Sequence, residues 1–395
     1  MISFDEAIHL ISSAAKPLGM ETVPLARAAG LVLAQPVVAK IDSPRRDTSA
    51  MDGYAVDAED LKAFPARLTI LGESFPGAPW SGVVERGTCV RVFTGAPVPR
   101  GANQVVMQED VRRQDDCAFL DFDPGPTRYI RERASDFAAG EEILPTGTVL
   151  HPRAIVAAAG ADIDKVAVFR RPRLHIFSTG DELAEPGTAR DTADAIPESV
   201  SFGVAALAQQ WGAIGADTTR LKDEVASMQA AAEQAIDSAD LIVVTGGASV
   251  GEKDFAKAMF AAHGLHFLFS NVAIRPGKPA WLGLVGDRFI VGLPGNPTSA
   301  LVTARLFLAP LLALIGGRSI ESALAWRSAR LRAAVPAAGA REIFHRAAIR
   351  DGSVEVLKFQ DSSAQKALAY ADVLVRQAAR SSALSVGDIV PILDF

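Results

Sequence analysis

The chain of 395 residues has 49% hydrophobic and 22% charged residues, values typical of a globular protein with about two to four domains. Its net charge of −6 and the lack of a long Lys/Arg run exclude nucleic acid as an expected partner. No continuous apolar run reaches the roughly 18 residues of a membrane span, and the two cysteines, Cys89 and Cys117, lack metal-ligand spacing. We therefore expect a cytoplasmic protein that contacts no membrane and holds no cysteine-ligated zinc.

Residues 1–40 are expected to begin with a helix and to continue as a mixed segment. Ser3 and Glu6 match a capping box, the pair of side chains that closes the first turn of a helix. Residues 137–170 are also mixed, and we expect them to pack with residues 1–40 as one α/β domain, domain I. Between them, the apolar runs of residues 41–136 are short and broken by Gly and Pro, which predicts a β-rich inserted domain, domain II.

Residues 171–318 alternate between apolar strands and helical patterns. The run Leu241–Thr245 is continuously apolar, as in a strand buried on both faces of a parallel sheet. This alternation predicts a doubly wound, mostly parallel sheet with helices on both faces, domain III. Short strands then predict a small C-terminal β-barrel or β-sandwich over residues 319–395, domain IV. Helices are expected at residues 199–211, 224–238 and 254–263, and after Asn296-Pro297, with Asn296 as the N-cap and Pro297 at the first helical position.

Three predicted strands end in Thr-Gly, at Thr94-Gly95, Thr179-Gly180 and Thr245-Gly246. Glycine at such an end permits positive φ and a close approach of backbone N–H groups to a ligand. A tight strand-to-helix turn would need the same residues, so each pair alone leaves both interpretations open. In Thr245–Gly251, the glycines at 246, 247 and 251 and Ser249 precede a helix, whose N-terminus attracts phosphate. The sequence therefore predicts a pocket for a phosphate-bearing or otherwise anionic ligand within Leu241–Pro297.

Two proline-stiffened turns add to this pocket. Arg275-Pro-Gly-Lys278-Pro holds two cations in place, as suits recognition of a phosphate or oxyanion, and Gly292–Pro297 leads from a strand end into a helix. Asp254 lies just after the glycine-rich segment. It would suit a Mg²⁺ that bridges phosphate oxygens, or it would serve as a helix N-cap.

A different motif, Gly-x-Ser-x-Gly, also matches Gly247–Gly251. This is the nucleophile elbow of serine hydrolases, and Ser249 would be the nucleophile. Asp287 and His345 follow in the required order. His345 falls in the predicted C-terminal β domain rather than at a strand end of the central sheet, which counts against this alternative.

Six motifs together resemble the MoeA/gephyrin E-domain family, in that family's order and over nearly the whole chain. They are Ser49-Ala-Met-Asp-Gly-Tyr-Ala, Thr94-Gly-Ala-Pro-Val-Pro, Ser178-Thr-Gly-Asp-Glu-Leu, Thr245-Gly-Gly-Ala-Ser-Val-Gly, Arg275-Pro-Gly-Lys-Pro and Gly292-Leu-Pro-Gly-Asn-Pro. The resemblance implies a molybdopterin molybdenumtransferase, which inserts molybdate into adenylylated molybdopterin, releases AMP and uses a divalent cation such as Mg²⁺. It also implies an elongated homodimer whose site is shared between domain III of one subunit and domains I and II of the other.

The same resemblance assigns roles to individual residues. It implies a catalytic set of Asp52, Thr94, Arg131, Asp136, Glu182, Asp223, Asp254 and Lys278, with Glu182 and Asp254 as the metal ligands. It implies a substrate-binding set of Thr179, Gly180, Thr245, Gly246, Gly247, Ser249, Gly251, Arg275, Pro294, Asn296, Pro297 and Ser362.

The chain departs from the family's pattern in three places. Glu198-Ser-Val200 stands where an Asp-[Ser/Thr/Cys]-Asn motif is usual, Asn271 stands where many members carry Lys, and Phe359-Gln-Asp-Ser362 replaces Gly-Gln-Gly-Ser. Asn271 and Asp361 lower the positive potential expected around an anionic substrate. They motivate an alternative function, a weak or inactive paralogue that binds molybdopterin or a related anion as a carrier or scaffold.

Overall fold

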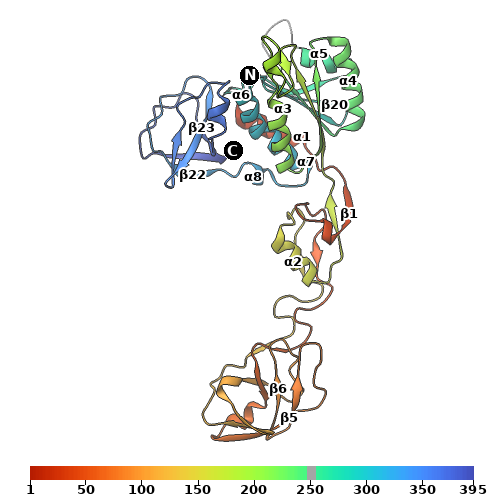
Figure 1. Cartoon of the computed structure of the whole chain (residues 1–395), viewed down its shortest axis with the longest axis vertical. Coiled ribbons are helices and arrows are strands. Elements are labelled where there is room, and N and C mark those ends of the chain that lie inside the picture. Colours follow the sequence, from red (N-terminus) through yellow and green to blue (C-terminus); the bar gives the residue numbers. More distant parts are fainter. Residues whose placement is uncertain (247–254) are drawn as a thin grey trace.

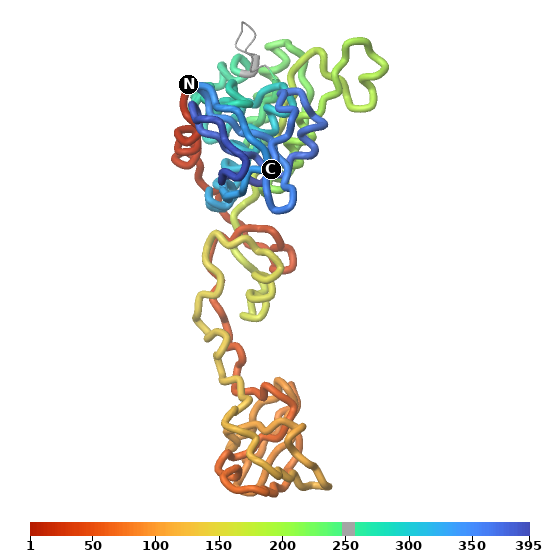
Figure 2. The backbone as a smooth tube through the Cα atoms, turned by 90° about the vertical axis from the view of Figure 1, so that its left-hand side faces the viewer, coloured from red at the N-terminus to blue at the C-terminus, as the bar shows by residue number. Residues whose placement is uncertain are grey.

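The structure is a computed structural model that describes residues 1–246 and 255–395. The molecule is elongated, with one β body at the far end, a narrow middle, and two bodies side by side at the other end (Figures 1 and 2). We call these the far body, the middle body, the α/β body and the C-terminal body. Each is defined below by its sheet.

The far body is built on a six-stranded sheet in the order β7-β4-β6-β5-β9-β8. Its interior is apolar on both sides of the sheet, with Tyr54 and Leu68 in one cluster and Ala55 and Val90 in another. The strands are β4 Gly53–Val56, β5 Ala66–Ser74, β6 Thr88–Val92, β7 Gln104–Met107, β8 Arg112–Gln114 and β9 Cys117–Leu120. Thr94 follows β6 and Asp52 precedes β4, so antiparallel pairing of these strands brings the two residues to the same end of the sheet.

The middle body forms where the chain passes toward the far body and returns. Its core contains Leu33, Leu150 and Val168, drawn from both passages of the chain. The pairs are β1 Met20–Pro24 with β12 Lys165–Phe169, β2 Val37–Val38 with β11 Glu142–Leu144, and β3 Thr48–Ser49 with β10 Ile130–Arg131, beside α2 Pro152–Gly160.

The first helix, α1 Phe4–Ala14, lies with the α/β body. Its predicted capping box is confirmed, because Ser3 and Glu6 exchange the two expected hydrogen bonds. Phe4, Ala7 and Ile11 are buried in the same cluster as the central sheet. The grouping of residues 1–40 with 137–170 therefore differs from the structure over α1, because its apolar face finds the larger core.

The α/β body contains a six-stranded sheet in the order β16-β13-β17-β21-β20-β18. Strands β16, β13, β17 and β21 are mutually parallel, as predicted for this segment, whereas β20 pairs antiparallel with both β21 and β18. Only Gly286 and Asp287 separate β20 from β21, which is too short for a crossover helix and gives a hairpin. The strands are β13 Arg173–Thr179, β16 Ile214–Leu221, β17 Leu241–Thr245, β18 His266–Ser270, β20 Trp281–Val285 and β21 Arg288–Leu293.

Helices cover both faces of this sheet (Figure 1). One face packs against α1, α3 Val200–Gln210 and the helix after β21, and the other against α4 Val225–Ser238 and α5 Phe255–Ala261. The helix after β21 runs without a break as α6 Pro297–Thr303, a π-helical turn Ala304–Leu308 and α7 Ala309–Ile315. It is long and apolar enough to cross a membrane, but 89% of its apolar window is buried inside the protein, as in a core helix.

The C-terminal body is a mostly antiparallel sheet in the order β19-β23-β25-β26-β22, with β24 paired to β23. Its first strand, β19 Ile274–Arg275, comes from the α/β segment and runs parallel to β23, which joins the two bodies. The strands are β22 Arg327–Arg330, β23 Glu342–Arg350, β24 Ser353–Val356, β25 Val373–Gln377 and β26 Ile389–Asp394. The short helices here are α8 Ile320–Ala323 and α9 Gln365–Leu368.

Candidate active site

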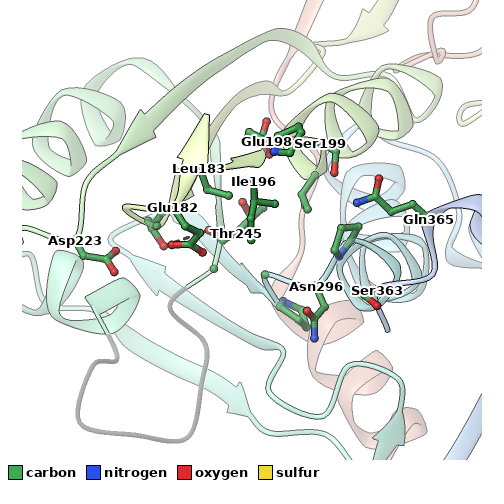
Figure 3. Close-up of a pocket in the computed structure, with 18 of the residues that line it drawn as sticks. Glu182, Leu183, Ile196, Glu198, Ser199, Asp223, Thr245, Asn296, Ser363 and Gln365 are labelled. Carbon is green, nitrogen blue, oxygen red and sulfur yellow. Dashed lines mark hydrogen bonds between the residues drawn. The ribbon is translucent and has the colours of Figure 1, made fainter. Parts of the chain in front are cut away.

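A cavity of about 550 Å³ opens at the C-terminal edge of β13, β17 and β21 (Figure 3). This is the edge at which open α/β sheets bind ligands. Two short parallel strands, β14 Leu183–Ala184 and β15 Ile196–Pro197, form one side, and the segment between them projects from the body (Figure 2). The described lining residues are Thr179, Gly180, Glu182, Leu183, Ile196, Pro197, Glu198, Ser199, Val200, Asp223, Thr245, Gly246, Pro279, Pro294, Gly295, Asn296, Pro297, Ser363 and Gln365.

Two Thr-Gly strand ends lie side by side in this cavity, as the sequence predicts. Gly246 has φ +90°, and a Cβ there would lie 2.5 Å from the Thr179 carbonyl oxygen. A Cβ at Gly180 would lie 2.8 Å from Glu182 Oε2, so the missing side chain leaves the space that the Glu182 carboxylate occupies. Both positions favour glycine because of their positive φ, +146° at Gly180 and +90° at Gly246, and at Gly246 a side chain would also meet the Thr179 backbone.

The polar groups of these strand ends brace the sheet. Thr179 Oγ1 donates to the Thr245 carbonyl over 3.3 Å, and the Gly246 N–H donates to the Leu293 carbonyl over 3.3 Å. The Gly180 N–H donates to the Leu221 carbonyl over 3.4 Å. The expectation that glycine N–H groups face the ligand therefore does not hold for Gly180 and Gly246, because neighbouring strands already accept their hydrogen bonds.

The charged side chains of the described lining are all acidic. They are Glu182, Glu198 and Asp223, and no Lys, Arg or His is among the lining residues within 1–246 and 255–395. Glu182 and Asp223 lie on one side of the cavity, and Asn296, Ser363 and Gln365 on the other (Figure 3). An anionic ligand would meet a negative surface here unless cations are added from elsewhere.

Glu198 has a structural role that the sequence comparison did not anticipate. Its carboxylate accepts hydrogen bonds from the Ser201 N–H over 2.8 Å and from the Ser201 hydroxyl over 2.5 Å, and it is only 6% exposed. The N-cap residue of α3, Ser199, makes no side-chain cap. Glu198 thus satisfies the first turn of α3 in place of the N-cap side chain.

The N-terminus of α6 is tied to the C-terminal body at the cavity wall. Asn296 is the N-cap and Pro297 opens the helix, as predicted, but the Asn296 amide donates to Ser362 Oγ over 3.1 Å instead of capping the helix. The Thr298 N–H donates to the Ser362 carbonyl over 3.1 Å. Ser363 and Gln365 therefore line the cavity, whereas the predicted Ser362 is not among its described lining residues.

A buried arginine holds the same loop from below. Arg346 is 1% exposed and donates to the carbonyls of Phe359 and Asp361 over 3.2 and 3.0 Å. Gln360 accepts from the Arg346 N–H and returns a hydrogen bond to the Arg346 carbonyl over 2.8 Å. Burial lowers the pKa of the Arg346 guanidinium below its ordinary value. The guanidinium therefore holds the loop through three acceptors, the Phe359 and Asp361 carbonyls and the Gln360 side-chain oxygen.

The basic turn lies beside the cavity rather than within its described lining. Arg275 and Lys278 are both exposed, and of this turn only Pro279 lines the cavity. Arg275 belongs to β19 and pairs with Ile343 of β23. Gly277 has φ +99°, and a Cβ there would lie 2.0 Å from Thr303 Cγ2, so the turn packs tightly on α6.

Asp52, Thr94, Arg131 and Asp136 belong to the far and middle bodies, which lie below the α/β body in Figure 1. In the far body, Asp52 Oδ1 accepts from the Thr94 N–H over 2.7 Å and from the Thr94 hydroxyl over 2.8 Å. The N–H bond, then the hydroxyl bond, lower the pKa of Asp52. Arg131 lies in β10 of the middle body, and Asp136 follows it; both side chains are exposed.

Gly247, Ser249, Gly251 and Asp254 lie outside the described residues. The other members of the hydrolase triad are not brought to the cavity. Asp287 precedes β21, at the opposite edge of the sheet from Pro294, and the buried His345 is hydrogen-bonded to Gln377 over 2.8 Å in the C-terminal body. The serine-hydrolase alternative therefore lacks its acid and its base.

Sequence reasoning missed the lining residues that come from other layers. Ser363 and Gln365 arrive from the C-terminal body, and Leu183 and Ile196 from the β14–β15 pair. No local pattern marks such contacts. Only Glu198 carried a signal, since an acid three residues before Ser201 has the spacing of a helix-capping side chain.

Comparison with known proteins agrees with this geometry. Residues 2–161 match the family model described as the MoeA N-terminal region (domain I and II), and residues 175–314 match that of a probable molybdopterin binding domain. The chain is 36% identical over 310 residues to the molybdopterin molybdenumtransferase of Nostoc sp., covering 75% of this chain and 70% of the relative. It is 35% identical over 321 residues to that of Haemophilus influenzae, covering 80% and 78%.

The comparison extends to other relatives and to solved structures. Molybdopterin molybdenumtransferase 2 of Mycobacterium tuberculosis is 35% identical over 349 residues, covering 86% of this chain and 85% of the relative. The crystal structure of the molybdopterin biosynthesis moeA protein from Pyrococcus horikoshii OT3 superposes with a TM-score of 0.86 at 26% identity, covering 100% of both chains. The chain belongs to the MoeA family of molybdopterin molybdenumtransferases.

Proposed function

We propose that this protein inserts molybdenum into molybdopterin, with adenylylated molybdopterin and molybdate as substrates and AMP as a product. Relatives at 35–36% identity carry the name molybdopterin molybdenumtransferase. The observation that carries the proposal is the cavity at the strand ends of the segment that matches the molybdopterin-binding model. Its volume of about 550 Å³ lies within the roughly 300–1,000 Å³ of small-molecule sites.

The proposed site is shared between two copies of the chain. Asp52 and Thr94 flank β4 and β6 of the far body, which lies at the other end of the molecule from the α/β body, so one chain does not bring them to the cavity (Figure 1). The described cavity lining is acidic, whereas Arg131 is an exposed cation of the middle body. A second copy that inserts its middle and far bodies would add cations to a cavity that needs them for an anionic substrate. The contributed residues would be Asp52, Thr94, Arg131 and Asp136.

The residues of the cavity fit a magnesium ion carried by substrate phosphates. Glu182 and Asp223 supply hard oxygen ligands on one side of the cavity, and no cluster of three or more possible metal ligands occurs among the described residues. Mg²⁺ is commonly held by one or two carboxylates together with phosphates and waters, so this sparse donor set is sufficient. When bound, the ion would neutralise phosphate charge. We propose Glu182 as a ligand, with Asp254 from the segment outside the described residues.

The chemistry needs no protein nucleophile, because the substrate's phosphoanhydride is already activated. The protein's part is to position the substrate and to offset the charge that develops as AMP leaves. We propose that Arg275 and Lys278, at the cavity margin, attract the oxyanion, and that Pro294, Asn296 and Pro297 shape the wall. The buried Thr179 and Thr245 keep the strand ends in place.

The carrier or scaffold alternative rests on departures that the structure accounts for. Glu198 caps α3, and Asn271 adopts φ +64°, a left-handed conformation that asparagine tolerates better than lysine. Asp361 turns its carboxylate to the Ser363 N–H and hydroxyl, over 2.8 and 2.6 Å. Each departure has a local structural reason, so none requires loss of turnover. We also propose a cytoplasmic location, supported by two free cysteines.

A direct test is AMP release by the purified protein with adenylylated molybdopterin, Mg²⁺, and molybdate or tungstate in parallel. We expect AMP to appear only when molybdopterin adenylate and an oxyanion are both present. Absence of AMP under conditions where the Haemophilus influenzae relative is active would refute the proposal. A fluorophosphonate probe should leave Ser249 unlabelled.

Sharing of the site is tested with two inactive variants in one dimer. In a heterodimer of Asp52→Asn and Glu182→Gln subunits, a shared site would have one intact copy and one doubly altered copy. We expect about half of wild-type activity, although each homodimer is nearly inactive. A heterodimer as inactive as both homodimers would show that each chain works alone.

A further inference from the structure

A second cavity, of about 220 Å³, lies on the α/β body where it meets the middle body. Its lining includes Arg171 and Arg318, together with Gln209, Gln210 and Trp211 at the end of α3. No Asp or Glu is among its lining residues in the part of the chain that the structure describes. The charged residues that line it are therefore basic, whereas those of the cavity at the strand ends are acidic.

Arg318 supplies an uncompensated charge to this cavity. Its side chain is half-buried, and its Cζ lies 5.7 Å from the centroid of the Trp211 ring. No carboxylate or carbonyl of the described residues accepts a hydrogen bond from its guanidinium. A guanidinium has five N–H donors, and those of Arg318 stay open to water or to a ligand in the cavity, because none of its nitrogens is a buried atom without a partner.

Arg171 adds a second charge from the connection between the two bodies. Its Nε donates to the Gly212 carbonyl over 2.8 Å and its Nη2 to the Ala213 carbonyl over 3.0 Å, which holds the group in place. Burial, and then the charge of Arg171, lower the pKa of Arg318. The two cations are thus close enough to repel each other.

Helix capping does not account for Arg318. The last carbonyls of α7 are already taken, because Gly316 N–H donates to Leu312 and the Arg318 backbone N–H donates to Ala313. The carbonyls of Gly212 and Ala213, which follow α3, accept their hydrogen bonds from Arg171. The Arg318 guanidinium therefore remains for a group that enters the cavity.

We propose that this cavity binds a small tetrahedral oxyanion of the phosphate or sulfate class between Arg171 and Arg318. The volume of about 220 Å³ exceeds several times the roughly 30 Å³ of one liquid water, so one such anion fits with a few waters. Charge-assisted hydrogen bonds from a guanidinium fork match the geometry of phosphate and sulfate oxygens. The amides of Gln209 and Gln210 offer neutral donors at the rim.

The proposal is tested by calorimetric titration of the full-length protein with inorganic phosphate, sulfate and acetate in separate runs, with Trp211 emission as a second signal. We expect saturable binding of one phosphate or sulfate per chain and weaker binding of acetate. Arg318→Gln should weaken phosphate binding by at least about tenfold, because a hydrogen-bonded charge pair is lost. Arg318→Lys should retain part of the affinity.

Controls separate this site from the proposed active site. Arg153→Gln removes an exposed arginine of α2 and should leave phosphate affinity unchanged. Equal thermal melting of Arg318→Gln and wild type without anion would show that the variant is folded. Three results would overturn the proposal: no saturable binding, undiminished affinity in folded Arg318→Gln, or loss of binding in Lys278→Gln instead. None of them depends on AMP release.

Discussion

One carboxylate oxygen of Asp52 accepts two hydrogen bonds from Thr94, from its backbone N–H over 2.7 Å and from its hydroxyl over 2.8 Å. Both bonds lower the pKa of Asp52, so this carboxylate is held ionised and in one orientation. Both residues lie in the far body, Asp52 just before β4 and Thr94 just after β6. The carboxylate is therefore oriented before any substrate binds, as the proposed shared site requires.

Replacing Thr94 by Ala should reduce kcat/KM for AMP release about 10- to 100-fold, because Asp52 loses one of its positioning bonds. The pKa of Asp52 should rise, since a hydrogen bond to its charged form is removed. The acid limb of the pH–activity profile should therefore move to higher pH. Thr94→Ser keeps the hydroxyl and serves as the matched control. An Ala variant with wild-type rate and pH profile would contradict the assigned role.

Asp240 anchors the start of β17 and should be important for stability. Its side chain is 0% exposed and accepts from Arg170 over 2.8 and 2.9 Å and from Arg288 over 3.3 Å. Asp240→Asn should lower the free energy of unfolding by about 1–3 kcal/mol, because the buried carboxylate loses the charge that pairs with these partly exposed arginines. Chemical denaturation at pH 7 measures this. Asp164→Asn breaks the exposed 3.5 Å pair with Lys40 and should leave the free energy of unfolding nearly unchanged.

The same carboxylate predicts a pH dependence. Burial raises the pKa of Asp240, but the hydrogen bonds and charges of Arg170 and Arg173 outweigh it and the pKa is lowered overall. Its stabilisation is therefore present above the unfolded pKa of about 3.9 and is lost as pH falls below that value through the folded pKa. Wild type should lose stability between pH 4 and 2 more steeply than Asp240→Asn. Parallel curves for the two proteins would contradict this assignment.

Glu198→Gln should make the substrate bind more tightly without unfolding α3. The amide keeps an oxygen for the Ser201 N–H while it removes one of the negative charges that line the cavity. We expect KM for adenylylated molybdopterin to fall about two- to fivefold. Glu182→Gln, which alters a proposed metal ligand, should instead lower kcat. An increase in KM for Glu198→Gln with an intact fold would show that its charge assists binding.

Asn271→Lys should not improve activity. Asn271 has φ +64° and is not among the described residues that line the cavity. Lysine in this conformation should cost about 1 kcal/mol of stability, whereas Asn271→Gly should be tolerated. Thermal unfolding and AMP release of both variants measure the two effects. Faster AMP release by the Lys variant would restore the view that a missing cation limits this enzyme.

Local patterns predicted the elements of the α/β body, because its strands are continuously apolar and its helices start at recognisable residues. Leu241–Thr245 and the Asn296-Pro297 helix start are examples. The antiparallel β20–β21 hairpin was missed, since a buried hairpin strand and a buried parallel strand are equally apolar. The packing of α1 against the α/β body was not predicted, because an apolar helix face has the same pattern whichever core it packs against.

The site was predictable where chemistry follows a strand end, as at Thr179-Gly180 and Thr245-Gly246. It was not predictable where distant segments meet. Ser363 and Gln365 line the cavity because Arg346 and Asn296 fix their loop, through contacts that span 15 and 66 residues of the sequence. The glycine N–H groups expected to face a ligand were instead used between strands, which depends on sheet register.

The two passages of chain through the middle body have a mechanical consequence. A body attached by one strand could swivel, whereas one attached by paired strands at β1–β12, β2–β11 and β3–β10 resists torsion and bends mainly at its joints. Because the far body lies at the other end of the molecule from the α/β body, any bending near Arg170 would displace Asp52 more than it displaces the middle body (Figure 1). Substitutions in the middle body should therefore change where the far body is placed more than they change the chemistry of the site.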